Sequence, residues 1–304
     1  MPLFDGRLEP LFGLSYFRDD RSIDGVDRSN GAPRTGGLTF DSWNPRFNLK
    51  YKPAENGTIY FNAAKGFRSG ALQTPAQAAA ANITLGLAPG TITPNVQPDK
   101  LWTYELGTRW ELADGQLLAE ASVYRTDWDD VLVQFATAAV ISLANGGDAK
   151  IEGADFGLSY RPERLEGLTL AASGNIQDAR FKSVVGALSV GTAIRKNGKV
   201  PNVPDMTFTV SADYRRELAA LGGVTGTAYV GYAFRDDVID ATTKNLKAGE
   251  LNDLTVRLGV QKDNWRLEGF VLNGLDDKDP VALSSTAVQI LYPRRYGVQL
   301  SVNF

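Results

Sequence analysis

The side chains that could do chemistry in this chain are carboxylates, lysines and arginines, because the sequence contains no histidine and no cysteine. Ser-His-Asp and Cys-His catalysis are therefore excluded within the chain, as are histidine-ligated zinc and iron sites and disulfides. A hydrolase here would have to depend on carboxylates or lysine alone. No strand–GxGxxG–helix arrangement occurs, which makes dinucleotide binding remote.

Acidic pairs stand where strand-like segments lead into long loops: Asp19-Asp20, Asp129-Asp130, Asp236-Asp237 and Asp276-Asp277. Clustered carboxylates could bind Ca²⁺ or bridge lipopolysaccharide through a cation, since hard cations prefer oxygen ligands. We favour the alternative, ordinary turn chemistry at solvated sites. Glu105 and Arg109 could line a transport path, but we expect them to pair with each other or with another domain, because unpaired buried charge is costly.

The elements that would position these groups are strands. In the last eleven residues, Tyr296, Val298, Leu300, Val302 and Phe304 alternate with small or polar residues, which predicts a strand with one apolar and one polar face. Similar segments recur along the chain, twelve in all. They cover about Arg7–Arg18 and residues 46–52, 58–65, 101–112, 116–134, 150–161, 168–181, 205–215, 224–234, 254–261, 265–275 and 294–304.

The connections between these segments alternate in length. Short turns are predicted at residues 53–57, 113–115, 162–167, 217–223 and 262–264, and long loops at 19–42, 66–100, 182–204, 236–250 and 276–293. Short turns at one end and long loops at the other are typical of an up-and-down outer-membrane barrel, and strands of about ten residues suit a tilted crossing. A β-sandwich would have shorter strands, and a propeller would show a repeat.

The two faces of the segments support the same interpretation. Charged residues lie opposite apolar faces at Lys50, Glu105, Arg109, Asp213, Arg257, Arg266 and Glu268, as expected for a polar lumen and a lipid-facing exterior. Aromatic residues near strand ends would form interfacial girdles, although they could also be core aromatics of a soluble β-domain. No run of eighteen apolar residues predicts a membrane-spanning helix, and the net charge of −3 gives no reason to expect nucleic acid.

Several short motifs, in order, resemble those of TonB-dependent outer-membrane receptors. They are Lys65-Gly66-Phe67-Arg68-Ser69-Gly70, Tyr104-Glu105-Leu106-Gly107, Glu152-Gly153, Val200 to Pro204, Asn273-Gly274-Leu275-Asp276 and Pro293-Arg294-Arg295-Tyr296-Gly297. The spacing of Asn273 and Leu275 departs from the family pattern. Phe304 stands where the family has its terminal aromatic, an outer-membrane assembly signal. We expect Gly66 and Gly70 to be loop-entry glycines that adopt positive φ.

The resemblance implies an all-β fold, an antiparallel up-and-down transmembrane barrel. It covers nearly the whole chain, so we expect one barrel domain over residues 1–304, a partial version, with about twelve strands, of a receptor barrel of about 22 strands. We expect the plug domain, the TonB-contacting segment and the signal peptide to be absent from this sequence, because MPLFDGRLEP has no basic and apolar leader. The final strand would then either pair with the first to close a smaller barrel or leave an open edge.

The resemblance also implies a function, the uptake of scarce large solutes such as ferric siderophores across the bacterial outer membrane. TonB would act only through a further N-terminal region, and outer-membrane lipid, lipopolysaccharide and the barrel-assembly machinery would be partners. No cofactor, metal site or enzymatic activity is expected, and the ligand residues are unknown. The alternatives are a passive pore or inert fragment of twelve strands, and a soluble β-rich binding or carbohydrate-active domain.

Overall fold

The structure is a computed structural model of the 304-residue chain. It describes Phe4, Gly31 and residues 6–26, 33–136, 140–242, 247–283 and 287–303. No helix within these residues is long and apolar enough to span a membrane.

Twelve long strands form one antiparallel sheet, as the sequence predicts. They are β1 (Leu8–Val26), β2 (Pro33–Ala54), β3 (Gly57–Arg68), β6 (Asp99–Leu112), β7 (Leu117–Asp129), β10 (Ala149–Tyr160), β11 (Leu168–Phe181), β12 (Met206–Leu218), β13 (Val224–Arg235), β16 (Leu251–Lys262), β17 (Trp265–Leu272) and β20 (Arg295–Val302). Each strand pairs with its neighbour in chain order, which is the up-and-down topology.

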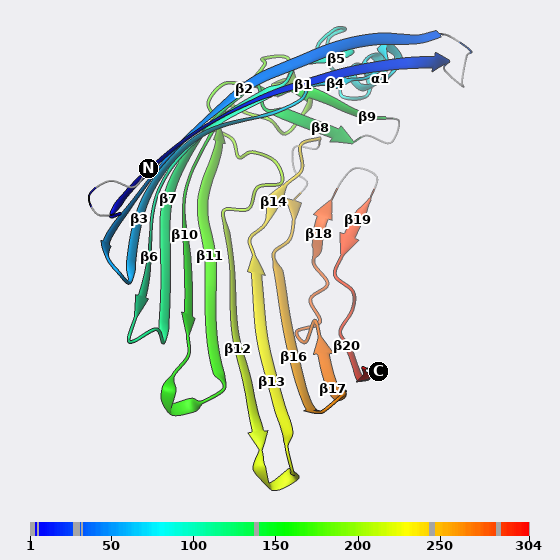
Figure 1. Ribbon diagram of the computed structural model, residues 1–304. Helices are drawn as coiled ribbons and strands as arrows, with labels where there is room; N and C mark the ends of the chain where they lie inside the picture. The colour runs from blue at the N-terminus through cyan, green and yellow to red at the C-terminus, as the bar shows by residue number, and fades with distance from the viewer. Residues whose placement is uncertain are drawn as a thin grey trace.

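The sheet is an open arc rather than a closed cylinder (Figure 1). Strands β1 and β20 are its two edges and do not pair with each other in the part of the chain described here. The expected alternative, a smaller barrel closed by the first and last strands, is therefore wrong for this sheet, because its two ends lie far apart across the arc.

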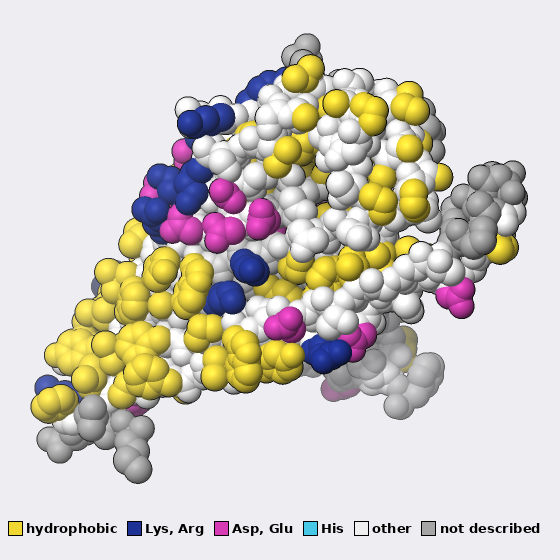
Figure 2. Space-filling model, turned by 90° about the horizontal axis from the view of Figure 1, so that it is seen from above, with side chains coloured by type: hydrophobic (Ala, Val, Ile, Leu, Met, Phe, Trp, Pro, Cys, Tyr) yellow, Lys and Arg dark blue, Asp and Glu magenta, His cyan; other side chains and the backbone are white. Residues whose placement is uncertain are grey.

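The strand register places all apolar faces on one side of the sheet. One row of paired residues runs Leu106, Val123, Ala154, Ile176 and Met206 across β6, β7, β10, β11 and β12. The neighbouring row on the other side runs Tyr60, Gly107, Ser122, Asp155 and Asn175. We call these sides the apolar face and the polar face. Apolar side chains gather over a broad area of the molecular surface at lower left in Figure 2.

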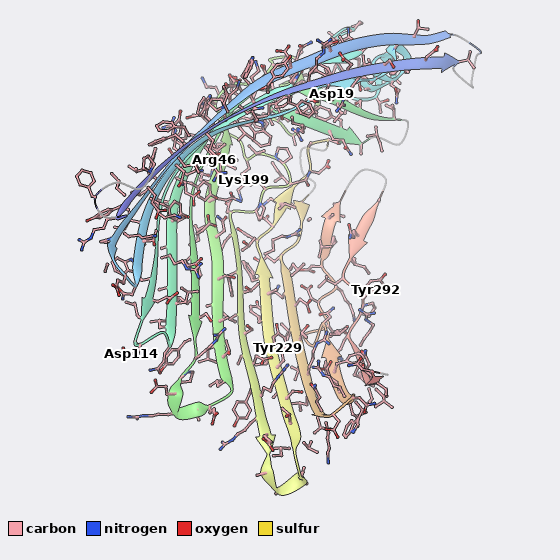
Figure 3. The ribbon with its side chains drawn as sticks, in the orientation of Figure 1. Asp19, Arg46, Asp114, Lys199, Tyr229 and Tyr292 are labelled. Atoms are coloured by element: carbon pink, nitrogen blue, oxygen red, sulfur yellow. The ribbon has the colours of Figure 1, made fainter. Side chains whose placement is uncertain are left out.

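Tight turns join the strands at one end of the sheet. The predicted turn after β6 is confirmed, since Ala113, Asp114 and Gly115 all have positive φ, and the turn after β16 contains Asp263 with a φ of 48°. This is the left-handed region that tight hairpin turns require. Figure 3 shows Asp114 at this end and Asp19 near the opposite end, where the long connections lie.

The predicted loop over residues 19–42 is mostly strand. Strand β1 continues to Val26 and β2 begins at Pro33, so the two form a hairpin that extends beyond the neighbouring strands (Figure 1). The extension has ion pairs two residues apart on one strand, Arg18 with Asp20 and Arg21 with Asp19. The charged and glycine-rich composition of residues 19–42 predicts a loop. A strand forms instead, because the backbone hydrogen bonds between paired strands need no apolar side chains.

The other connections contain short elements. They are β4 (Ala71–Leu72), α1 (Pro75–Thr84), β5 (Asn95–Val96), β8 (Leu132–Ala136), β9 (Ile141–Asn145), η1 (Glu163–Leu165), α2 (Leu188–Gly191), η2 (Ala219–Leu221), β14 (Val238–Ile239), β15 (Lys247–Ala248), β18 (Pro280–Leu283) and β19 (Val288–Ile290). Helix α1 begins with a capping box, in which Thr74 and Gln77 satisfy each other's backbone N–H groups, and has Pro75 in its first turn.

The main hydrophobic core of the described chain lies among the long connections rather than against the sheet. The connections of residues 71–97, 131–136, 140–148 and 182–203, which we call the loop cap, pack against one another and against the tops of β10 and β11. The five largest fully buried side chains belong to this core: Phe135, Phe181, Ile92, Leu188 and Ile194. The loop cap is therefore a packed unit built mainly from three connections, and Ala241 of a fourth connection joins its core.

Candidate functional site

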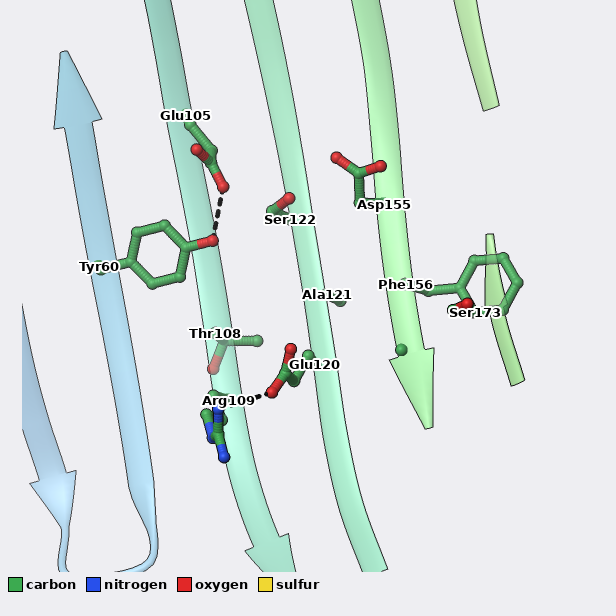
Figure 4. Close-up of a pocket in the computed structure, with 11 residues that line it drawn as sticks. Tyr60, Glu105, Thr108, Arg109, Glu120, Ala121, Ser122, Asp155, Phe156 and Ser173 are labelled. Carbon is green, nitrogen blue, oxygen red and sulfur yellow. Dashed lines mark hydrogen bonds and ion pairs between the residues drawn. The ribbon is translucent and has the colours of Figure 1, made fainter. Parts of the chain in front are cut away.

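The polar face of the sheet is the first part of the candidate site. Tyr60 on β3 donates a hydrogen bond of 2.5 Å to Glu105 on β6, and Arg109 forms an ion pair of 2.9 Å with Glu120 on β7 (Figure 4). Together with Ser122 and Asp155 these side chains line a concavity of about 460 Å³. The surface thus offers alternating hydrogen-bond donors and acceptors to a polar solute.

Glu105 and Arg109 do not pair with each other. They lie four residues apart on one strand, a separation of roughly 13 Å along the chain, so each finds its partner on the neighbouring strand instead. The expectation that they pair with each other is wrong for this reason, although both do face the polar side as predicted.

A second concavity of about 560 Å³ lies further along the polar face, over β12, β13, β16 and β17. Its centre is Glu268, only 6% exposed, which binds both Arg257 at 2.9 Å and Arg266. One buried carboxylate between two arginines leaves the group with a net positive charge. This part of the face would attract anionic groups.

Glycines on the polar face make room for aromatic rings. A Cβ at Gly107 would overlap the ring of Tyr60, and a Cβ at Gly153 would overlap that of Tyr124. The Tyr124 hydroxyl then reaches across β10 to donate to Gln177 at 3.0 Å and to accept from Asn175 at 2.8 Å. Two of the family motif positions, Gly107 and Gly153, are therefore explained by close packing of tyrosine rings.

We predict that Gly107→Ala lowers the free energy of unfolding by about 1–3 kcal/mol, because the new methyl group displaces Tyr60 from Glu105. Gly157→Ala is the matched control on the same face, where the nearest atom to a new Cβ is 3.8 Å away. Urea unfolding of both variants in detergent measures the difference. Equal stability of the two would contradict the packing role of Gly107.

The motif from Lys65 to Gly70 fastens the loop cap to the sheet. Arg68 binds the buried Asp99 and donates to the Leu132 carbonyl at 3.0 Å, and Asp99 accepts from the Leu132 N–H at 3.0 Å. Arg68 also lies over the ring of Trp128, 5.8 Å from its centre. These contacts join β3, β6 and the β8 connection at one point.

The glycines of this motif do not adopt positive φ, which corrects the sequence-based expectation. Gly70 is required for another reason, because a Cβ there would overlap the Val96 carbonyl and the ring of Phe40. Gly66 lies against Leu101 without overlap. Lys65 donates to the Trp43 carbonyl at 3.0 Å, and Phe67 contacts Phe17 edge-on at 5.1 Å.

The two last motifs meet at the long-loop end of β17. Asn273 donates to the carbonyls of Asp277 and Tyr292, at 2.9 and 3.1 Å. Asp276 accepts from the Arg294 N–H at 3.2 Å, directly after Pro293. In β20, Tyr296 is on the apolar face, and Gly297 lies under the ring of Phe270 on the polar face.

The structure thus distributes the motif residues over several junctions and does not gather them into one pocket. Glu105 contributes to the polar face, whereas Glu152 is on the opposite side of the sheet, paired with Lys150 at 3.0 Å. Phe304 lies outside the described residues. The roles of the motif residues as family positions remain predictions.

The loop cap was not predicted from the sequence. Helix α1 lies within the predicted loop over residues 66–100, although Thr74, Pro75 and Gln77 are helix-start signals. The core residues come mainly from three connections far apart in sequence, and only their convergence in space shows that they pack together.

Among the described residues, no cluster of three or more carboxylates could hold a metal ion. Three of the four acidic pairs instead use a neighbouring cation: Asp19 binds Arg21, Asp237 binds Lys247 and Asp276 binds Lys278, at 2.7, 2.7 and 2.9 Å. This favours ordinary turn and surface chemistry over Ca²⁺ sites. The hydrogen bond from Lys247 lowers the pKa of Asp237 below its ordinary value.

This pair predicts a pH dependence for the β14–β15 hairpin. Because the pKa of Asp237 is lower in the folded state, its stabilisation is present above the ordinary pKa of about 3.9 and is lost as the pH falls through the lowered value. The pair is partly solvated, so the effect is below about 1 kcal/mol. Hydrogen exchange of the hairpin at pH 6 and pH 2 should differ more in the native protein than in Asp237→Asn. The same difference in both would refute the role of the pair.

An up-and-down sheet with one apolar and one polar face, and with long connections at one end, defines a wall of an outer-membrane β-barrel. The family model for the TonB dependent receptor-like beta-barrel matches residues 1–273. The chain belongs to this family and is an outer-membrane protein. The apolar face therefore contacts lipid, and the polar face lines the lumen.

Two curated relatives are bacterial receptors. The chain is 26% identical over 273 residues to the probable TonB-dependent siderophore receptor PiuA of Acinetobacter baumannii, covering 88% of this chain and 34% of that protein. It is 27% identical over 197 residues to the catecholate siderophore receptor Fiu of Escherichia coli K12, covering 60% of this chain and 22% of that protein. The chain thus spans about a third or less of the length of these relatives.

Solved structures show the same fold. The ferric yersiniabactin uptake receptor FyuA from Yersinia pestis matches with a TM-score of 0.76 and 18% identity, covering 99% of this chain and 44% of that one. The ferric citrate transporter FecA matches with a TM-score of 0.69 and 17% identity, covering 98% of this chain and 43% of that one. Both matches span almost all of the chain.

Proposed function

We propose that this chain is part of a receptor that takes up a scarce, large solute, with ferric siderophores as the substrate class. The observation that carries the proposal is the 273-residue match to a protein named as a siderophore receptor. The curated relatives reported above are named as receptors rather than enzymes. Transport rather than catalysis also fits a polar face that lacks histidine and cysteine.

The geometry of the loop cap and of the polar face adds physical support for this proposal. A packed loop cap at the long-loop end would give the entrance a fixed shape, and pre-organised surfaces bind a bulky ligand at a lower entropic cost. The polar face beneath it has paired charges and hydroxyl groups that suit a hydrophilic complex. We place ligand capture at the loop cap and passage along the polar face.

The remaining partners follow from the family. In the complete protein, TonB would supply energy through a region outside this sequence, and the C-terminal strand with Phe304 would direct barrel assembly. One barrel domain over residues 1–304 is part of the same proposal.

Uptake of ⁵⁵Fe-loaded siderophores tests the proposal. Cells without other siderophore receptors should accumulate iron when they produce the complete protein, and an uncoupler of the proton gradient should abolish the uptake. Binding that persists without uptake would separate recognition from energised transport. A failure to bind catecholate, phenolate and citrate complexes alike would overturn the proposed substrate class.

A further inference from the structure

The two concavities of the polar face carry charge of opposite sign. The concavity of about 460 Å³ is lined by three carboxylates and one arginine: Glu105, Glu120, Asp155 and Arg109. The concavity of about 560 Å³ is lined by three arginines and two carboxylates: Arg215, Arg257, Arg266, Asp213 and Glu268. An anion that moves along the polar face is therefore repelled by the first concavity and attracted by the second.

The second concavity has a floor that lacks a side chain. The register places Arg215, Thr227, Gly259 and Glu268 in one row across β12, β13, β16 and β17. A Cβ at Gly259 would lie 2.9 Å from the Thr227 hydroxyl oxygen and 2.8 Å from the Leu267 carbonyl oxygen. Because Gly259 has no side chain, the Thr227 hydroxyl reaches over it and the space between the arginines stays open. We call this site, Arg215, Arg257 and Arg266 around Gly259, the arginine hollow.

The arginines keep most of their donors for a further partner. Arg257 and Arg266 both bind the buried Glu268, yet their side chains remain 42% exposed. Arg215 is exposed and takes no part in these two ion pairs. An arginine carries five N–H donors, so one carboxylate leaves most of them unused. Glu268 thus orders two guanidinium groups beside the hollow without filling it.

The arginine hollow lies at the short-turn end of the sheet. Arg215 is three residues before the last residue of β12, and Arg266 is the second residue of β17. Short turns mark the inner, periplasmic end of an outer-membrane barrel. Figure 3 shows Tyr229, which lines the same concavity, well away from the long connections. The hollow is therefore remote from the loop cap, where we place capture.

We propose that the arginine hollow is a carboxylate-binding site that receives the transported solute at the inner end of the lumen. The planar guanidinium fork matches a carboxylate with two parallel hydrogen bonds. The hydroxyl groups of Thr227 and Tyr229 can donate to the remaining oxygens. The inference rests on the proposed transport function and adds the charge of the solute.

The dimensions of the arginine hollow indicate more than one carboxylate. Its volume of about 560 Å³ is within the range of small-molecule sites. Its four strands span about 14 Å at the usual spacing between neighbouring strands, so a single carboxylate cannot reach all three arginines. The solute class that fits is a complex with two or more free carboxylate groups.

The binding test uses the complete protein, purified from outer membranes in detergent, and iron-free citrate as the probe. In calorimetric titration at low ionic strength, Arg215→Gln should bind citrate about tenfold more weakly than the native protein, because it loses one charge-assisted partner and keeps both Glu268 pairs. The matched control is Arg216→Gln, the next residue on the outward face, which should bind as the native protein does. Absence of binding by the native protein, or equal binding by native and Arg215→Gln protein, would overturn the proposal.

Two further variants test the sign of the charge and the place of binding. Asp213→Asn removes a repelling carboxylate and should bind citrate about two- to threefold more tightly, whereas weaker binding would contradict the proposal. Citrate should slow the reaction of Thr255→Cys, inside the second concavity, with a neutral maleimide. It should leave the reaction of Ser122→Cys, in the first concavity, unchanged. Protection of Ser122→Cys alone would place the anion elsewhere and overturn the assignment.

Uptake of ⁵⁵Fe separates this inference from the transport proposal. In cells that produce the complete protein, Arg215→Gln should lower the uptake rate of ferric citrate about tenfold relative to Arg216→Gln, and that of an uncharged ferric hydroxamate complex far less. Equal losses for both complexes would overturn the carboxylate assignment and leave transport standing. If the native protein takes up neither complex, the proposed substrate class fails, while citrate binding in detergent still decides whether the hollow binds carboxylates.

Discussion

Phe135→Ala should lower the stability of the loop cap by about 3–5 kcal/mol without unfolding the membrane-spanning sheet. The ring of Phe135 is fully buried in the cap core, so its removal leaves a cavity there. The sheet below has its own hydrogen-bonded ladder and lipid contacts, so the two parts should respond separately. Hydrogen exchange should accelerate in α1, β8 and β9 and stay slow in β12 and β13.

The matched control is Ile83→Ala in helix α1, because the Ile83 side chain is 80% exposed. It should change exchange in the loop cap by less than about 0.5 kcal/mol. If Phe135→Ala leaves exchange in the cap unchanged, the connections are not a packed unit. The proposed pre-organised entrance would then be withdrawn.

Val210→Arg should destabilise the protein in a bilayer by about 2–4 kcal/mol, whereas Thr209→Arg should change it by less than about 1 kcal/mol. These adjacent residues lie near the middle of β12, both exposed, on opposite faces of the sheet. An arginine on the lipid-facing side must enter hydrocarbon or distort the bilayer. On the polar side, the arginine replaces the Thr209 hydroxyl group, which forms a hydrogen bond of 2.9 Å with Ser173.

Urea unfolding in phospholipid vesicles measures both variants, and the difference between them removes effects common to any arginine on β12. A larger cost for Thr209→Arg than for Val210→Arg would reverse the assignment of the two faces. Equal costs would indicate that neither face contacts lipid.

The fold was predictable because its signal is local. Alternation along single strands, such as Leu168–Phe181 whose predicted and observed bounds coincide, depends only on side chains pointing to opposite faces. The register then brings these faces together without further information. Hairpins with short turns allow no other pairing partner, so the pairing of β2 with β3, β6 with β7, β10 with β11, β12 with β13 and β16 with β17 also follows from the sequence.

The sequence-based predictions that the structure corrects depend on features other than alternation along a single strand. The β1–β2 extension is a strand without an apolar face, and its charged side chains are exposed, so alternation could not reveal it. The closure of the sheet depends on its curvature and strand number rather than on the composition of β20. Glu105 and Arg109 find their partners on the neighbouring strands β3 and β7. These partners depend on the register between strands, which cannot be read from any single segment.

The candidate site was predictable only in part. The polar face was identified by its charges, but Tyr60 and Tyr124 reach their partners because Gly107 and Gly153 lie opposite them on the adjacent strands, a relation fixed by the register. The loop cap depends on contacts between connections far apart in sequence.

The central claim is that the apolar face contacts lipid and the polar face lines an aqueous lumen, and cysteine labelling tests it most directly. The chain has no native cysteine, so single substitutions of Thr209, Val210, Ser211 and Ala212 give an unambiguous readout in intact outer membranes. A small water-soluble maleimide should label the variants at Thr209 and Ser211 at least about tenfold faster than those at Val210 and Ala212. All four should react alike after unfolding in urea. Equal or faster labelling at Val210 and Ala212 in the folded protein would contradict the account.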